Sequence, residues 1–127
     1  MKTKAAVLYN PKQALQIEEL ELLPPQAGEI LVRWVATGVC RSDLHHIQGL
    51  APWPTPVVLG HEGAGIVEEV GPAVTRVQVG DHVLTSLVPY CGCCSWCIAG
   101  RPNLCDLRYG KRELMLDGTT RFRKGNT

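Results

Sequence analysis

The sequence lacks long apolar runs, blocks of like charge and low-complexity segments. No stretch of about 18 apolar residues is present, and the N-terminal segment lacks the apolar core and small-residue cleavage site of a secretory signal. Basic residues number 13 and acidic residues 12, so the net charge of +1 gives no reason to expect nucleic acid or an anionic membrane as a partner. We therefore expect a cytoplasmic protein that binds neither.

Disorder and a multidomain organisation are also disfavoured. The chain has 127 residues, of which 45% are hydrophobic and 20% charged, and this is the usage of one globular domain. The locally basic segment from Arg121 to Lys124 is interpreted as a solvated tail.

Alternating βαβ units are missing too. Short runs rich in β-branched residues end at proline and glycine turns, which is typical of a small β-barrel or sandwich. Strands are predicted over residues 4–9, 15–22, 30–39, 57–70 and, after a turn, 77–84. One or two helical turns are expected at 42–48, and Pro52, Pro54 and Pro56 exclude regular structure just before Val57. The expected class is mainly β, with a minor helical part (α+β).

No G-x-G-x-x-G motif follows a strand and opens a helix, so this chain contains no dinucleotide-binding Rossmann domain. Gly60, Gly63 and Gly65 have a different spacing within a strand-like segment. Their interpretation is close backbone packing or a bulge.

Cysteine is plentiful by contrast, with six residues, five of them between Cys91 and Cys105. In a reducing compartment such a cluster indicates metal binding rather than disulfides. The spacing C-x2-C-x2-C-x7-C is formed by Cys91, Cys94, Cys97 and Cys105. Four thiolates that close a tetrahedron make a structural zinc site, whose binding energy counts as folding energy. A zinc lobe is predicted at about residues 90–106.

Two other interpretations compete for this cluster. Bacterial ferredoxins also begin C-x2-C-x2-C, but their fourth cysteine comes after three residues and precedes proline, whereas Cys105 comes after seven and precedes Asp106. Free thiols without metal would need a core pattern, and glycine, tryptophan and arginine surround these cysteines instead. Cys93 lies outside the ligand pattern and is interpreted as a bystander that could compete for metal or oxidise.

Cys40 and His61 carry less information by spacing alone, since a lone cysteine after a strand is usually a small buried hydrophobe. Their context changes this view. Cys40 precedes Arg41-Ser42-Asp43-Leu44-His45, which supplies a cation, a hydroxyl, a carboxylate and an imidazole, and His61-Glu62 lies among glycines.

Four segments together resemble the zinc-containing medium-chain alcohol dehydrogenase family, in order along the chain. They are GVCRSDLH (38–45), PVVLGHEGAGIVEEVG (56–71), GDHV (80–83) and CGCCSWCIAGRPNLC (91–105). The DGTTRF stretch (117–122) resembles the segment after the cysteine lobe in glutathione-dependent formaldehyde dehydrogenases and bacterial relatives. The resemblance implies that residues 1–127 form the N-terminal GroES-like β-barrel part of the catalytic domain.

The resemblance also implies roles for individual residues. Two ligands of a catalytic zinc would be Cys40 and His61, with Glu62 beside the metal and Asp43 holding the His61 ring. Ser42, where many members have threonine, and His45 would carry the alcohol's proton to water. Arg41, which is histidine in part of the family, would face the pyrophosphate of NAD. The substrate would be a small alcohol or aldehyde, and the full-length parent would be a homo-oligomer. His46 and His82 have no comparable context and are expected to be structural or surface residues.

A catalytic zinc takes three protein ligands, and no cysteine or histidine occurs after Cys105. The third ligand and the cofactor domain of the family come from sequence after this point, so the chain is expected to be a fragment that is inactive by itself. Two alternatives stay open. The parent could be a polyol or glutathione-dependent formaldehyde dehydrogenase, or the chain could be a non-catalytic zinc-stabilised β module.

Overall fold

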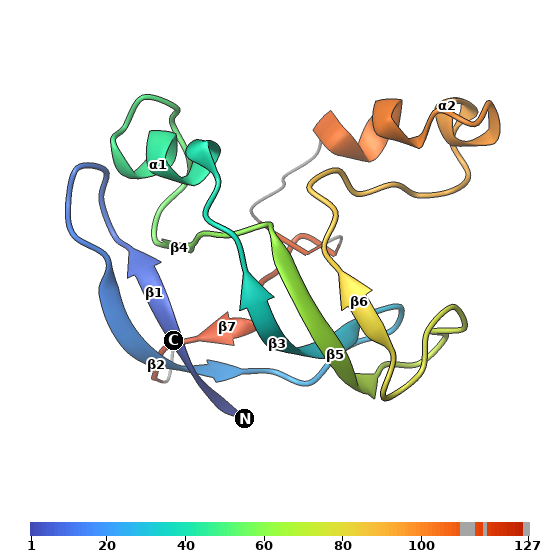
Figure 1. The fold of residues 1–127 in the computed structure, drawn as a ribbon, viewed down its shortest axis with the longest axis horizontal. Coiled ribbons are helices and arrows are strands. Elements are labelled where there is room, and N and C mark those ends of the chain that lie inside the picture. The colour runs from blue at the N-terminus through green and yellow to red at the C-terminus, as the bar shows by residue number, and fades with distance from the viewer. Residues whose placement is uncertain (110–113, 116, 126–127) are drawn as a thin grey trace. The chain divides into compact units, whose positions relative to one another are not determined.

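The computed structural model of the chain describes residues 1–109, 114–115 and 117–125, which divide into two compact units. The first unit comprises Met1–Thr85 together with Arg121–Thr127, and the second comprises Ser86–Thr120. Strands make up the body of the first unit, as the mainly β composition predicted (Figure 1). The second unit contains the cysteine-rich segment.

The first sheet of unit 1 joins segments from both ends of the chain. Its strands are β1 (Lys2–Leu8), β2 (Gln16–Leu22), β4 (Val57–Val58) and β7 (Phe122–Arg123), in the spatial order β4-β1-β2-β7, and all pairs are antiparallel. Strands β1 and β2 pair from Lys2 with Glu21 to Val7 with Gln16. Val7, Leu8 and Leu20 are buried, so these two strands contribute to the core. Because Val7 and Leu8 are adjacent and point to opposite faces, both faces of β1 are covered at its end.

The second sheet carries the segments around the candidate site. It consists of β3 (Ile30–Thr37), β5 (Gly63–Val70) and β6 (His82–Leu84), in the order β3-β5-β6, again antiparallel. The register between β3 and β5 shifts at two places. A Cβ atom on Gly65 would lie 2.6 Å from the carbonyl oxygen of Arg33, and one on Gly63 would lie 2.7 Å from the Trp34 ring. The predicted close packing is thus present at Gly63 and Gly65, and one register shift lies beside Gly65. The prediction was wrong for Gly60, because a Cβ atom there would meet nothing within 4 Å, and its φ of +132° is what favours glycine.

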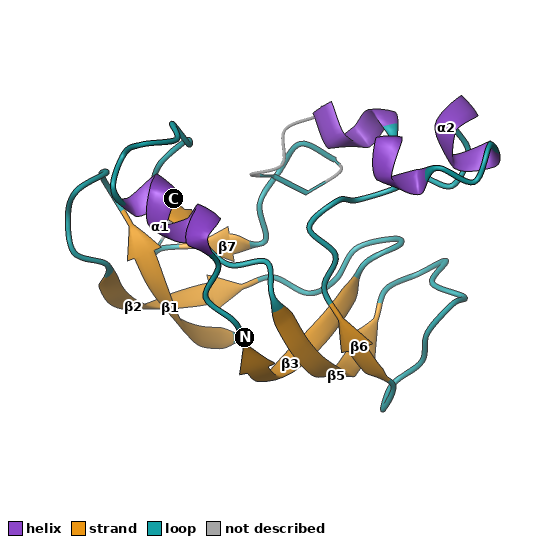
Figure 2. Cartoon of the chain, turned by 45° about the horizontal axis from the view of Figure 1, so that its top comes forward, coloured by secondary structure: helices purple, strands orange, loops and turns teal. Residues whose placement is uncertain are grey.

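Helix α1 (Arg41–Ile47) comes after β3, as the sequence predicted (Figure 2), and the Ile47 carbonyl accepts the N–H of Lys12 from the β1–β2 turn at 2.6 Å. It begins where the Asp43 carboxylate accepts the backbone N–H of Cys40, at 3.1 Å. It ends before Gly49, whose φ of +71° suits a residue without a side chain. In the second unit lie α2 (Ser95–Ile98) and 3₁₀ turns at Pro102–Leu104 and Asp106–Tyr109. Within the described ranges, no helix has the length and apolar composition that crossing a membrane requires.

The strand predictions were correct for β1, β2, β3 and β6, whereas the segment 57–70 forms two strands rather than one. Residues 59–62 separate β4 from β5 and include His61.

The prediction of a solvated tail at Arg121–Lys124 was wrong. Strand β7 pairs with β2, and the Arg121 guanidinium donates from Nε and Nη2 to the two carboxylate oxygens of Glu29, at 2.8 and 2.6 Å. Both side chains are nearly buried, with 12% and 15% exposed. Lys124 pairs with Glu18 and the Tyr9 hydroxyl. Local basic composition gave no sign of these partners, because Glu29 lies 92 residues away.

The Arg121–Glu29 pair provides a test of how β7 is anchored. Arg121→Met would leave the Glu29 carboxylate without its main cation, so we expect a loss of about 3 kcal/mol in unfolding free energy. Arg33→Met removes an exposed cation paired with Glu68 and should cost less than about 1 kcal/mol. Urea denaturation followed by circular dichroism measures both. Equal losses would show that the bidentate pair contributes no more than an exposed one.

Candidate metal centres

The first candidate centre brings together Cys40, His61 and Glu62, whose potential ligand atoms all lie within 4.8 Å of one another. Cys40 lies after β3, and His61-Glu62 immediately precede β5. Antiparallel pairing places Thr37 opposite Gly63, and the Gly38 N–H donates to the Glu62 carbonyl at 2.7 Å. Sheet pairing therefore brings together Cys40 and His61, which are separated by twenty residues in the sequence. A thiol, an imidazole and a carboxylate form a donor set that suits zinc.

Asp43 is the one buried charged residue in the described part of the chain, with 8% of its surface exposed. One carboxylate oxygen accepts the Cys40 N–H, and the other lies 3.4 Å from Nδ1 of His61. A carboxylate at Nδ1 favours the tautomer with its proton on that nitrogen. Nε2 of His61 is then the nitrogen with a free lone pair.

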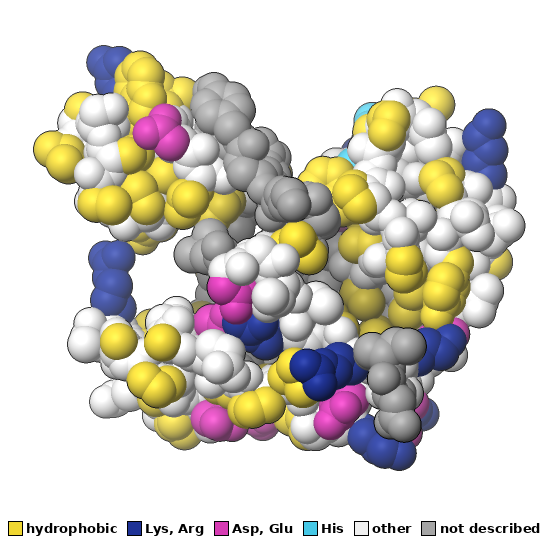
Figure 3. Space-filling model, turned by 180° about the vertical axis from the view of Figure 1, so that it is seen from behind, with side chains coloured by type: hydrophobic (Ala, Val, Ile, Leu, Met, Phe, Trp, Pro, Cys, Tyr) yellow, Lys and Arg dark blue, Asp and Glu magenta, His cyan; other side chains and the backbone are white. Residues whose placement is uncertain are grey.

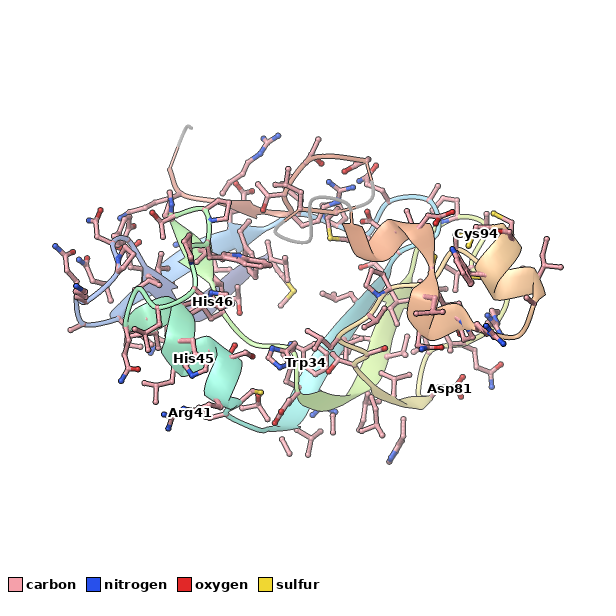
Figure 4. The ribbon with its side chains drawn as sticks, turned by 90° about the horizontal axis from the view of Figure 1, so that it is seen from above. Trp34, Arg41, His45, His46, Asp81 and Cys94 are labelled. Carbon is pink, nitrogen blue, oxygen red and sulfur yellow. The ribbon has the colours of Figure 1, made fainter. Side chains whose placement is uncertain are left out.

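The remaining predicted residues lie on α1 close to this centre. The Ser42 hydroxyl is 3.5 Å from Nε2 of His61. Arg41 Nε donates to Nε2 of His45 at 3.3 Å, one turn further along the helix, where Figure 4 shows both side chains. His46 does not join the group, since its Nδ1 lies 2.9 Å from the Ala51 carbonyl oxygen and its ring packs against Trp53. His82 is exposed on β6.

The second candidate centre lies within unit 2 and consists of the four predicted cysteines. The sulfur of Cys105 is 3.7 Å from that of Cys91 and 3.9 Å from that of Cys94. Four sulfurs placed about 2.3 Å from a central zinc ion stand about 3.8 Å apart along each edge of the tetrahedron. All six cysteines are free of disulfides. The spacing of the sulfurs fits a single enclosed metal ion.

Backbone N–H groups in this lobe donate hydrogen bonds to the sulfurs of Cys91 and Cys94. The N–H groups of Cys93 and Cys94 donate to Sγ of Cys91, at 3.5 and 3.3 Å, and lower the pKa of that thiol to about 6. The N–H groups of Asp106 and Cys97 likewise lower the pKa of Cys94. Because a metal binds the thiolate and not the thiol, these donors favour the form that metal binding requires.

The lobe has very little apolar core. Among its described residues Cys105 is the one that is fully buried, whereas Trp96 and Ile98 are 40% and 77% exposed. Hydrophobic side chains are accordingly visible on the lobe's surface (Figure 3). Cys93 is exposed and lies outside the four-sulfur group. A segment with so little buried apolar surface requires another source of stability, such as a metal ion.

Two residues next to the first centre were missed by sequence reasoning. Gly38 leaves room for the Glu62 carboxylate, because a Cβ atom there would overlap it. Thr85 donates its hydroxyl hydrogen to the His61 carbonyl, at 2.5 Å, and accepts the Gly63 N–H at 2.8 Å. No local pattern marks Thr85, since its contact with His61 results from the pairing of β5 with β6.

Comparison with known proteins agrees with this geometry. The family model "alcohol dehydrogenase GroES-like domain" matches residues 26–123. An NDMA-dependent alcohol dehydrogenase from Amycolatopsis methanolica is 51% identical to this chain. The alignment covers the whole of this chain and 34% of that protein. The fold of the present chain matches that of benzyl alcohol dehydrogenase from Acinetobacter calcoaceticus with a TM-score of 0.88 and 40% identity. The match covers 96% of this chain and 34% of that one.

A cobalt- and zinc-bound thermostable alcohol dehydrogenase from Pyrobaculum aerophilum is also similar, with a TM-score of 0.77 and 31% identity over 97% of this chain and 39% of that one. The chain thus spans about a third of the length of the curated relatives it matches. The matched family and the mainly β fold agree with the resemblance found in the motifs. The chain belongs to the zinc-containing medium-chain alcohol dehydrogenase family, as its GroES-like domain.

Proposed function

We propose that this chain supplies the metal-binding part of an NAD-dependent zinc alcohol dehydrogenase that oxidises a small alcohol to an aldehyde or ketone. The observation that carries the proposal is the convergence of Cys40, His61 and Glu62 within 4.8 Å, with Asp43 behind the His61 ring. The relatives are about three times as long, so the activity is proposed for the whole protein.

Cys40 and His61 would hold a catalytic zinc through Sγ and Nε2, with Glu62 beside it. Asp43 lies 3.4 Å from Nδ1 of His61 and would thereby leave Nε2 as the nitrogen that binds the metal. A zinc ion bound here would supply Lewis acidity, which makes the hydroxyl of an alcohol easier to ionise. Gly38 leaves the space in which the Glu62 carboxylate lies beside Cys40.

The proton of the alcohol needs a route out of this partly buried centre. Ser42 is suited to begin it, because its hydroxyl both donates and accepts and lies 3.5 Å from Nε2 of His61. Three residues along α1, on the same face, His45 can accept the proton and pass it to water.

Arg41 is exposed at the start of α1, where it can meet the pyrophosphate of NAD. The nicotinamide would accept the hydride, which is chemistry that the cofactor supplies. Arg41 donates to Nε2 of His45, so moving the guanidinium to a phosphate would free that nitrogen to accept a proton. We further propose a cytoplasmic location, since a cluster of free thiols persists in a reducing compartment. A homo-oligomeric whole protein is proposed on the family resemblance alone.

The lobe is proposed to hold a structural zinc through Cys91, Cys94, Cys97 and Cys105. The sulfur separations of 3.7 and 3.9 Å support one shared ion. They disfavour a four-iron cluster, in which each cysteine binds a different iron atom. A non-catalytic zinc module would need this lobe, but it would have no use for the Cys40, His61 and Glu62 group.

The structural zinc is tested by two serine variants of neighbouring cysteines. Cys97→Ser should lose the tightly held zinc and melt well below the unchanged chain, because the lobe has almost no core of its own. Cys93→Ser should keep one tightly held zinc and the original melting temperature. Elemental analysis and thermal melts measure both. Zinc retained by Cys97→Ser, or iron with visible absorbance in the unchanged chain, would contradict the assignment.

A third variant separates the two centres. Cys40→Ser should melt like the unchanged chain, since the first centre lies just outside the ends of β3 and β5, whose pairing and buried residues do not involve a metal. A loss of stability equal to that of Cys97→Ser would show that both centres are structural.

The relay is tested in the full-length protein by two substitutions of Ser42. Ser42→Ala removes the hydroxyl and should lower kcat by about 10²- to 10⁴-fold with zinc content unchanged. Ser42→Thr keeps the hydroxyl and should retain most of the activity. Steady-state kinetics with NAD and a primary or aromatic alcohol measures both. Unchanged turnover in Ser42→Ala would show that the proton leaves by another route. Failure of the unchanged protein to oxidise any alcohol would contradict the proposed function itself.

A further inference from the structure

Thr85 is hydrogen-bonded through both its hydroxyl and its backbone N–H to the short segment that carries His61 and Glu62. Its hydroxyl donates to the His61 carbonyl and accepts the Gly63 N–H, and its own N–H donates to the Gly63 carbonyl at 2.9 Å. These bonds lie on either side of Glu62. One residue therefore fixes the backbone at both ends of the dipeptide from which two potential metal ligands project.

The same dipeptide is held from its other side by β3. The Gly38 N–H donates to the Glu62 carbonyl, and Gly38 lies two residues before Cys40. Thr85 comes directly after β6, the neighbour of β5 on the side away from β3. The segment 61–63 is thus hydrogen-bonded on one side to Gly38, just after β3, and on the other side to Thr85, just after β6.

We infer that Thr85 is a positioning residue for the metal centre formed by Cys40, His61 and Glu62, an inference that rests on the function proposed for that centre. Thr85 touches neither a ligand atom nor the proposed route of the proton. It acts through the backbone, by holding the His61 ring at the distance where Nδ1 meets Asp43 and Nε2 faces Ser42. A hydroxyl is needed because the position must donate to a carbonyl and accept from an N–H at once.

Water could replace these hydrogen bonds if the hydroxyl were missing, because Thr85 is exposed. It would satisfy the carbonyl and the N–H without linking them to β6, so the segment would gain freedom that metal binding must then remove. The expected defect is therefore in the geometry of His61 and in metal affinity, rather than in the fold as a whole.

The experiment compares Thr85→Val, which removes the hydroxyl at nearly constant volume, with Thr85→Ser, which keeps it. Ser86→Ala is the control, because it deletes the neighbouring hydroxyl, which bonds to the Val88 carbonyl instead. Each chain first receives one equivalent of Zn²⁺ to fill the four-cysteine lobe. Co²⁺ is then titrated and followed by its visible absorption, with Cys40→Ser identifying the signal of the first centre. ¹⁵N-histidine NMR before cobalt addition reads the tautomer of His61.

Thr85→Val should bind Co²⁺ at the first centre about 10- to 100-fold more weakly and show a mixture of His61 tautomers. Thr85→Ser and Ser86→Ala should resemble the unchanged chain in both measurements. A folded Thr85→Val with unchanged cobalt affinity and an unchanged tautomer would overturn the inference. If Thr85→Val fails to fold, Thr85→Ser and Thr85→Ala carry the same comparison, and equal results from these two would also overturn it.

The two readouts keep this inference distinct from the function on which it rests. An unchanged chain that binds no cobalt at Cys40 and His61 would count against the proposed metal centre. The tautomer comparison would still decide whether Thr85 orients His61.

Discussion

The candidate catalytic centre depends on one buried carboxylate, that of Asp43. Its two oxygens join the backbone of Cys40, at the start of helix α1, to the ring of His61, on the segment before β5. Burying a carboxylate is costly unless hydrogen bonds compensate for lost water, so this group favours the arrangement that satisfies it. The same interaction starts the helix that carries Ser42, and it therefore places both the metal ligands and the proposed proton acceptor.

The two candidate metal centres have opposite relations to folding. The first is assembled by strand pairing within unit 1, where Thr37 lies opposite Gly63 and buried residues such as Val67 form a core. The lobe has almost no apolar interior, and its loops turn backbone N–H groups onto the sulfurs of Cys91 and Cys94. In unit 1 the folded strands would position a catalytic metal. In the lobe, by contrast, metal binding would stabilise the folded conformation.

Local patterns in the sequence were sufficient for strands β1, β2, β3 and β6, for helix α1 and for the grouping of the four cysteines, because turn residues and ligand spacing are local signals. Long-range pairing was not visible in this way. Arg121 and Glu29 lie 92 positions apart, and nothing in the basic composition near Arg121 indicated a buried partner. Thr85 escaped notice for the same reason, since its hydroxyl meets His61 through the register of β5 and β6. The family resemblance, and not a local pattern, predicted that Cys40 and His61 belong to the same metal site.

The two-centre assignment is tested most directly by a crystal structure of the chain with zinc bound, recorded with anomalous data at the zinc edge. We predict two zinc sites, one enclosed by the sulfurs of the four-cysteine lobe and one bonded to Sγ of Cys40 and Nε2 of His61. In the second site, Nδ1 of His61 should face Asp43, and Thr85 should keep its bonds to residues 61 and 63. Zinc bonded through Nδ1 of His61, or bound to neither Cys40 nor His61, would contradict the assignment.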